Sequence, residues 1–118
     1  MSKKPTPIVT RESLIRMLNE ADMVKRGHIV GRAMVALFNR QTASEQHSNT
    51  TLQSNGVGFS GSDSIIGSLT AKSYLKNHTL APWQIEQWTK PMSNGFPKLC
   101  KYVRQLNEIA QEKRNNHR

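Results

Sequence analysis

The chain has 118 residues, which suits one domain with one modest hydrophobic core. Seventeen Lys and Arg residues against eight Asp and Glu give a formal net charge of +9, so we expect a negatively charged partner: nucleic acid, anionic lipid or an acidic protein surface. The single cysteine, Cys100, excludes an intrachain disulfide and a metal site built on several cysteines.

The chain shows no pattern of a membrane-spanning or secreted protein. No apolar run approaches the roughly 20 residues that cross a bilayer. The N-terminal residues MSKKP are not followed by a secretory apolar region. Together with the single cysteine, this pattern predicts a cytoplasmic protein without a membrane partner.

The predicted organisation is a single helical domain, residues 10–114, between two short ends. Residues 1–9 carry Lys3, Lys4 and two prolines without hydrophobic periodicity, which predicts a flexible basic arm. Residues 115–118 are polar and are expected to fray.

The first helix is predicted to begin at Thr10, whose hydroxyl is a suitable N-cap. Glu12 adds negative charge where the helix dipole favours it. Gly27 follows two basic residues and is the predicted end of this helix. Its apolar side is expected to carry Leu14, Met17, Leu18, Ala21 and Val24.

The second helix has Arg32 and Arg40 on its polar side, and no acid lies between Met23 and Ser44. Gly31 lies inside this helix. Because an interior glycine costs about 1 kcal/mol relative to alanine, Gly31 predicts the close approach of another helix. The apolar side is expected to carry Ile29, Val30, Ala33, Met34, Leu37 and Phe38.

The middle of the chain contains a predicted helix restart followed by a loop. Thr42-Ala43-Ser44-Glu45 has the spacing of a capping box, which predicts a short helical turn or a restart. Residues 46–54 are polar apart from one leucine and are expected to form an exposed loop.

The segment NGVGF, residues 55–59, precedes the third helix and permits two interpretations. Exposed amides at a helix start bind anions, so Gly56, Gly58 and Ser60 are candidates for phosphate contact. The favoured interpretation is a structural turn in which one glycine adopts positive φ and Phe59 enters the core. Neither a dinucleotide-binding nor a P-loop pattern is present.

The third helix is expected to begin at Ser60 and Asp63, which have capping-box spacing, and to end near Asn77. Lys72 and Lys76 place positive charge toward its C-terminal end, where the dipole favours it. The residues expected to face the core are Ile65, Ile66, Leu69 and Tyr74.

The fourth helix is expected to begin at Ala81-Pro82 and to stop before Pro91, because proline is well tolerated only in a first helical turn. It carries Trp83 and Trp88, which either pack in the core or stack on nucleic-acid bases. Core packing is favoured for both, and more strongly for Trp88.

The last helix is predicted to begin at Pro97 and has a regular basic spacing. Lys98, Lys101 and Arg104 recur every three residues along one side, and Gln105 adds hydrogen-bonding capacity. This side is either a phosphate-binding ridge or a solvated helix face. The apolar side is expected to carry Leu99, Tyr102, Val103, Leu106, Ile109 and Ala110.

Catalytic and metal-binding patterns are not recognisable in the sequence. The four histidines are scattered, and none stands at helical spacing from another ligand residue. Asp63 and Glu45 fit helix starts better than catalysis, and no Ser-His-acid or Cys-His order suggests itself. We therefore expect a protein that is not an enzyme and that holds neither a metal nor a cofactor.

Helical periodicity without sustained alternation predicts an all-α fold, a compact bundle of about five short helices. The residues expected to be largely buried are Leu18, Leu37, Phe38, Phe59, Ile66, Leu69, Tyr102 and Leu106.

Several stretches resemble small proteins or domains encoded by phages, plasmids and other mobile elements. They are GRAMVALFNRQT at residues 31–42, NGVGFSGSD at residues 55–63, and KY ahead of QL at residues 101–106. The resemblance covers about residues 28–106 and implies an association with nucleic acid or its processing machinery. Ala81-Pro82-Trp83-Gln84 departs from the Thr-Pro-x-Gln pattern of these proteins.

The favoured function is a non-enzymatic accessory protein that binds DNA or RNA without implied sequence specificity. The alternative is a mobile-element inhibitor or adaptor that docks on an acidic surface of a host nucleoprotein complex, such as a defence complex. A membrane-surface binder is disfavoured, because the basic residues are spread over several helices. The residues expected to bind nucleic acid or an acidic partner are Arg32, Arg40, Lys98, Lys101 and Arg104, with a smaller contribution from Lys3 and Lys4.

Overall fold

The computed structural model of the protein describes residues 7–48 and 58–115. In these ranges the chain is all-α, with one isolated β-bridge between Pro91 and Pro97, so the predicted bundle of about five helices is confirmed. The elements are, in order, α1 (Arg11–Glu20), α2 (Met23–Ser48), the 3-10 helix η1 (Gly61–Asp63), α3 (Ser64–Asn77), α4 (Pro82–Thr89), the 3-10 helix η2 (Lys98–Tyr102) and α5 (Val103–Asn115).

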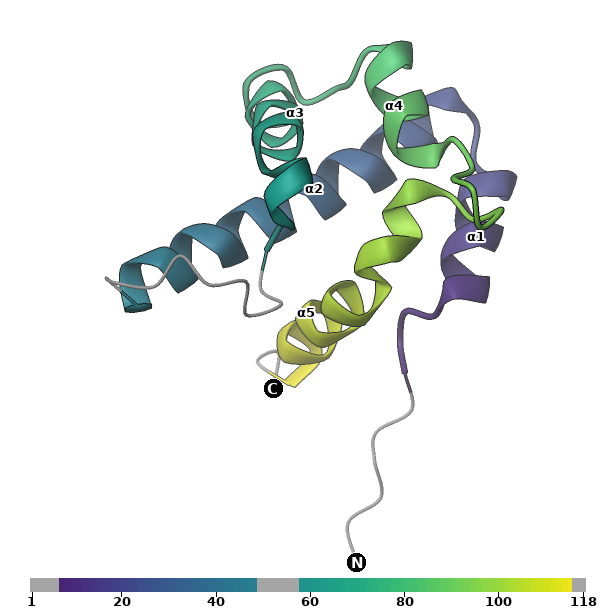
Figure 1. Cartoon of the computed structure of the whole chain (residues 1–118). Helices are drawn as coiled ribbons and strands as arrows, with labels where there is room; N and C mark the ends of the chain where they lie inside the picture. Colours follow the sequence, from purple (N-terminus) through teal and green to yellow (C-terminus); the bar gives the residue numbers. More distant parts are fainter. Residues whose placement is uncertain (1–6, 49–57, 116–118) are drawn as a thin grey trace, which may run out of the picture.

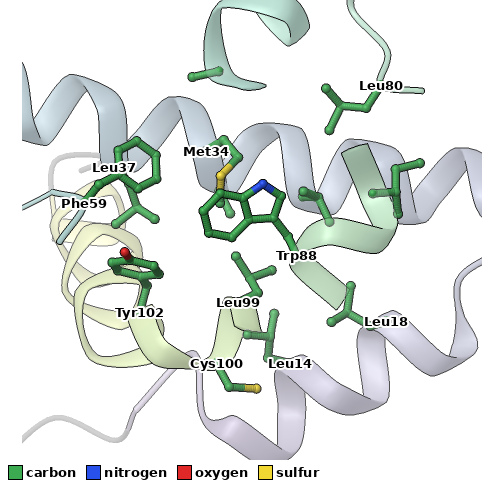
Figure 2. Packing of buried hydrophobic residues seen from close by; sticks show 14 residues of the cluster. Leu14, Leu18, Met34, Leu37, Phe59, Leu80, Trp88, Leu99, Cys100 and Tyr102 are labelled. Carbon is green, nitrogen blue, oxygen red and sulfur yellow. The ribbon is translucent and has the colours of Figure 1, made fainter. Parts of the chain in front are cut away.

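The longest helix, α2, crosses the molecule, and the other helices pack around it (Figure 1). α3 and α5 both contact α2, whereas α1 and α4 lie near the end where α2 begins. Apolar side chains from these helices and from η2 meet in one core around Trp88 (Figure 2). The largest fully buried side chains are Trp88, Met34, Leu37, Leu99 and Val30.

α1 begins where the sequence predicts and ends earlier. Thr10 Oγ1 accepts a hydrogen bond from the Ser13 N–H at 3.0 Å, and the Ser13 hydroxyl accepts one from the Thr10 N–H at 2.9 Å. The helix ends at Glu20, so it carries fewer apolar residues than expected. Leu14 and Leu18 are buried, but Met17 is exposed.

The start of α2 was not predicted. Asp22 Oδ1 accepts the N–H of Lys25 at 2.8 Å and thereby satisfies a free amide of a new helix. Gly27 therefore lies inside α2, where a Cβ would stand 3.2 Å from the Ile85 side chain, and the prediction that it ends the first helix is wrong. Val24, assigned to the apolar side of the first helix, is exposed on α2.

α2 continues through residues 42–45 to Ser48, so the predicted restart at Thr42 is wrong. Inside a helix each amide already donates to the carbonyl four residues earlier, and capping-box residues then have no free amide to satisfy. Residues 46–48 of the predicted loop belong to α2, so this part of the loop prediction is wrong, and residues 49–54 lie outside the described residues.

The close helix packing predicted at Gly31 is confirmed. A Cβ at this position would lie 2.2 Å from Cδ1 of Tyr74, so the ring of Tyr74 occupies the space that any larger residue needs. The Tyr74 hydroxyl is also hydrogen-bonded to Nδ1 of His28 at 2.8 Å. Tyr74 thus joins α3 to α2 by both packing and a polar contact.

α3 turns a different face to the core than expected. The buried side consists of Gly67, Thr70 and Ala71. A Cβ on Gly67 would stand 2.5 Å from the Phe59 ring, so close packing here requires small residues. Three of the large side chains expected to face the core point away from it, with exposed fractions of 73% for Ile65, 60% for Leu69 and 37% for Ile66. Tyr74, the fourth, packs against the core as expected.

The core predictions are confirmed in part. Leu18, Leu37, Phe59 and Tyr102 are buried, Phe38 and Leu106 are partly buried against the core, and Ile66 and Leu69 are exposed. Trp88 is fully buried as expected, but Trp83 is 66% exposed in the first turn of α4, so its predicted core position is wrong.

Candidate anion-binding surface

Asp63 holds both Lys98 and Lys101, two of the predicted phosphate-binding residues. The lysines lie on η2, and because residues three apart in a 3-10 helix eclipse each other, both side chains leave the same side. Lys98 Nζ lies 3.1 Å from Asp63 Oδ1, and Lys101 Nζ lies 3.1 Å from Oδ2. Since Asp63 is only 3% exposed, this cluster holds η1 against η2.

The Asp63 carboxylate accepts a third hydrogen bond, from the Tyr102 hydroxyl at 2.5 Å. Burial acts to raise the pKa of Asp63, but the hydrogen bonds from Tyr102, Lys98 and Lys101 together hold that pKa below its ordinary value. Burial and the hydrogen bond to Asp63 raise the pKa of Tyr102 to about 12. Asp63 makes no side-chain cap at the start of α3, so the capping box predicted for Ser60 and Asp63 is wrong.

The backbone amides of Gly58 and Ser60, in the described part of the loop before α3, are satisfied from within the protein. Gly58 has φ 78°, as predicted for one of the two glycines. Its N–H and C=O are both bound by the side chain of Gln105, at 2.7 and 2.9 Å. The Ser60 N–H donates to the Tyr102 hydroxyl at 3.1 Å. Neither Gly58 nor Ser60 therefore presents a free amide to a phosphate.

Phe59 lies between helices, as the structural-turn interpretation predicts. Its ring centroid is 6.1 Å from that of Trp88 and 5.9 Å from that of Tyr102. Gly56, the other glycine of the predicted loop, lies outside the described residues.

Arg40 and Arg104 both approach Glu108. Arg40 Nη2 lies 2.7 Å from Oε1 of this residue, and Arg104 Nη1 lies 3.8 Å from Oε2. Arg40 also donates to the carbonyl of Gln105 at 3.4 Å, so it ties α2 to α5. The Arg104 side chain is 72% exposed, and an exposed ion pair of this length holds it weakly.

Arg32 is the one predicted binding residue, among those described, that is exposed and makes no ion pair with a described residue. It belongs to a set of exposed cations on α2 and α3, which we call the α2–α3 basic surface: Lys25, Arg32, Lys72 and Lys76. Residues 23–40 of α2 and the whole of α3 contain no acid. The two helices that carry these acid-free stretches pack on each other.

Of the described acids other than Asp63, Glu45 lies in α2 beyond residue 40, and the others lie on other elements. Glu12, Glu20 and Asp22 belong to α1 and the turn after it, Glu86 to α4, and Glu108 and Glu112 to α5. The positive charge is therefore unevenly distributed, with acid-free stretches at residues 23–40 of α2 and over the whole of α3.

α2, α3 and α5 also enclose an open groove of about 550 Å³. α2 lies between the other two helices and contributes Arg32, Val35, Ala36, Asn39 and Arg40. The flanking helices contribute Tyr74 and Leu75 from α3, and Ile109, Glu112 and Lys113 from α5. The groove thus combines an apolar lining with several basic side chains.

Within the described ranges, no three His, Cys, Asp or Glu side chains gather as a metal site requires. Cys100 is buried, and burial raises the pKa of its thiol, which disfavours the reactive thiolate. None of the helices in these ranges is both long and apolar enough to cross a membrane.

Lys3 and Lys4 of the predicted arm lie outside the described residues. The end of the arm is attached to the helical domain, since Asn107 Oδ1 accepts the N–H groups of Ile8 and Val9 at 2.7 and 3.0 Å. This contact has no local sequence pattern, because its members stand almost a hundred residues apart.

Two residues on the α3 part of the α2–α3 basic surface were not among the binding residues predicted from the sequence. Lys72 and Lys76 were assigned only to the dipole of α3, although the absence of any acid from Ser64 to Ile85 marks their surroundings as basic. Gln105, by contrast, was placed on an exposed ridge and is buried. No protein-family model matches the chain, and no curated protein or solved structure matches it either.

Proposed function

We propose that the protein is a non-enzymatic nucleic-acid-binding accessory protein whose α2–α3 basic surface contacts phosphates. The observation that carries this proposal is that four exposed cations lie on two packed helices that have no acid among residues 23–40 and 64–77. Such a surface suits a phosphate backbone, because each neutralised phosphate releases condensed counterions. Phosphate contacts carry no base sequence, so we expect DNA or RNA binding with little sequence preference.

The other predicted cations have smaller roles in this proposal. Lys98, Lys101 and Arg40 already face internal carboxylates, so a phosphate has to compete with Asp63 or Glu108 for them. Arg104, which is largely exposed, is a secondary contact. A cytoplasmic location is part of the proposal, and the resemblance to mobile-element proteins supports a role beside nucleic-acid processing.

The proposal is tested by fluorescence anisotropy with labelled duplex DNA and single-stranded RNA over a series of salt concentrations. The variant Arg32→Gln/Lys72→Gln/Lys76→Gln removes three contacts. Each duplex phosphate contact contributes about 0.9 to the logarithmic salt slope, so we expect a slope shallower by about 2.7 and weaker binding to every sequence.

The matched control is Arg16→Gln/Lys90→Gln/Arg114→Gln, which removes the same charge from exposed positions on other elements. It should bind far more tightly than the first variant. Equal losses in the two variants, or salt-independent binding by the unaltered protein, would show that the α2–α3 basic surface is not the site.

A further inference from the structure

We propose that the groove between α2, α3 and α5 docks an acidic amphipathic helical segment of a partner protein. This inference goes beyond nucleic-acid binding and stands without it. It concerns a concave surface with an apolar lining, whereas the proposed phosphate contacts concern exposed cations, of which only Arg32 also lines the groove.

The lining of the groove favours a protein segment as its occupant. Val35, Ala36, Leu75 and Ile109 place aliphatic surface in the groove, and Leu75 remains 51% exposed. Aliphatic side chains from a partner remove this surface from water, which is the main favourable contribution to most protein association. A phosphate backbone has no apolar group to place there.

The charges that line the groove determine the sign of the charge that a docked segment should carry. Three of the four charged side chains that line it are basic: Arg32, Arg40 and Lys113, against Glu112. Arg40 is neutralised by Glu108, which leaves Arg32 and Lys113 against a single acid. The groove is net positive, so carboxylates beside the apolar side chains of the partner complement it.

The length of the groove fits a short helix. Arg32 and Arg40 are eight residues apart on α2, which corresponds to about 12 Å along the helix axis. Two turns of a docked helix cover this distance and present apolar residues at positions i, i+3, i+4 and i+7. Acidic residues next to these positions then face the basic side chains.

The test uses the full chain and a labelled synthetic helical peptide of about 16 residues, with leucines on one face and glutamates beside them. We expect saturable binding in the micromolar range and amide chemical-shift changes on α2, α3 and α5. Leu75→Ser should weaken binding by about tenfold or more. Leu69→Ser is the matched control on the same helix, because Leu69 is similarly exposed and does not line the groove.

A second pair of variants tests the charge. Lys113→Glu should weaken binding several-fold, and Arg114→Glu, which alters a neighbour outside the lining, should have a much smaller effect. Absence of saturable binding up to about 1 mM peptide, or equal effects of Leu75→Ser and Leu69→Ser, would overturn the inference. Displacement of the peptide by duplex DNA that shifts the same groove amides even in Arg32→Gln, where the cation shared by the two surfaces is removed, would also overturn it, because the groove would then belong to nucleic acid.

Discussion

At the scale of single residues, the Asp63 carboxylate has two ammonium groups, one phenol hydroxyl and the Ser60 hydroxyl as neighbours and is almost inaccessible to water. A buried charge is tolerated when it is paired and its remaining lone pairs accept hydrogen bonds. Asp63 meets both conditions. Because one carboxylate faces two lysines, the cluster also leaves a surplus of positive charge beside η2.

We expect this cluster to make the protein sensitive to acid. The folded-state pKa of Asp63 lies below its ordinary value of 3.8, so its interactions stabilise the fold above about pH 4, and this stability is lost as the pH falls through the folded-state pKa. Denaturant unfolding between about pH 6 and about pH 2 measures the effect. Asp63→Asn should lower the unfolding free energy at neutral pH by about 1–3 kcal/mol and flatten the acid limb. If the unfolding free energy of Asp63→Asn falls as steeply with decreasing pH as that of the unaltered protein, Asp63 is not the group responsible for the acid sensitivity.

We expect the same cluster to contribute a loss of stability at alkaline pH, through Tyr102. Burial raises the pKa of Tyr102 from 10.0 to about 12, so the stability contributed by its neutral hydroxyl is present below about pH 10 and is lost as the pH rises toward 12. Tyr102→Phe should remove this loss. If the alkaline limb persists in Tyr102→Phe, another group causes it.

Residue roles were predictable where they depend on local backbone geometry. The helix start at Thr10, the positive φ of Gly58 and the close contact at Gly31 each follow from rules that act over a few residues. The roles of Lys98 and Lys101 were not predictable, because their partner Asp63 stands more than thirty positions away in sequence.

At the scale of elements, the presence of helices and some of their ends were predictable from sequence. The face that each helix turns to the core was not. The start of α4 at Pro82 and the end of α3 at Asn77 follow local signals. α3 fails the simple rule that large apolar residues face the core, because its close approach to α2 and Phe59 requires small residues at Gly67 and Ala71. Such a requirement depends on the neighbouring elements, which periodicity within one helix does not encode.

The buried and exposed faces of α3 in the structure predict mutational effects opposite to those expected from the sequence. Ile65→Ser/Leu69→Ser removes two large apolar side chains from exposed positions, so it should change the unfolding free energy by no more than about 0.5 kcal/mol per site. Ala71→Leu, at a fully buried position, should destabilise the protein by about 1–3 kcal/mol through overpacking. Denaturant unfolding of both variants provides the measurement. The reverse order of stabilities would restore the phase expected from sequence.

At the scale of the whole molecule, the net charge of +9 leads to the hypothesis of a polyanionic partner but does not single out a surface for it. The fold divides the cations into those that hold the structure together and those that face solvent without an acid nearby. Lys98 and Lys101 belong to the first class, and Lys72 and Lys76 to the second. Net charge alone treats the two pairs as equivalent.

A comparison of these two pairs separates charge placement from total charge, since Lys72→Gln/Lys76→Gln and Lys98→Gln/Lys101→Gln each remove two positive charges. The first variant should retain its melting temperature. Its slope of the logarithm of the duplex-binding constant against the logarithm of the salt concentration should be shallower by about 1.8, because two phosphate contacts disappear. The second should melt at a lower temperature, because the Asp63 carboxylate remains buried without its cations, and should lose less of the slope. Thermal unfolding and anisotropy on the same preparations measure both effects. Equal losses of binding would mean that the protein attracts nucleic acid through its total charge, with no preferred surface.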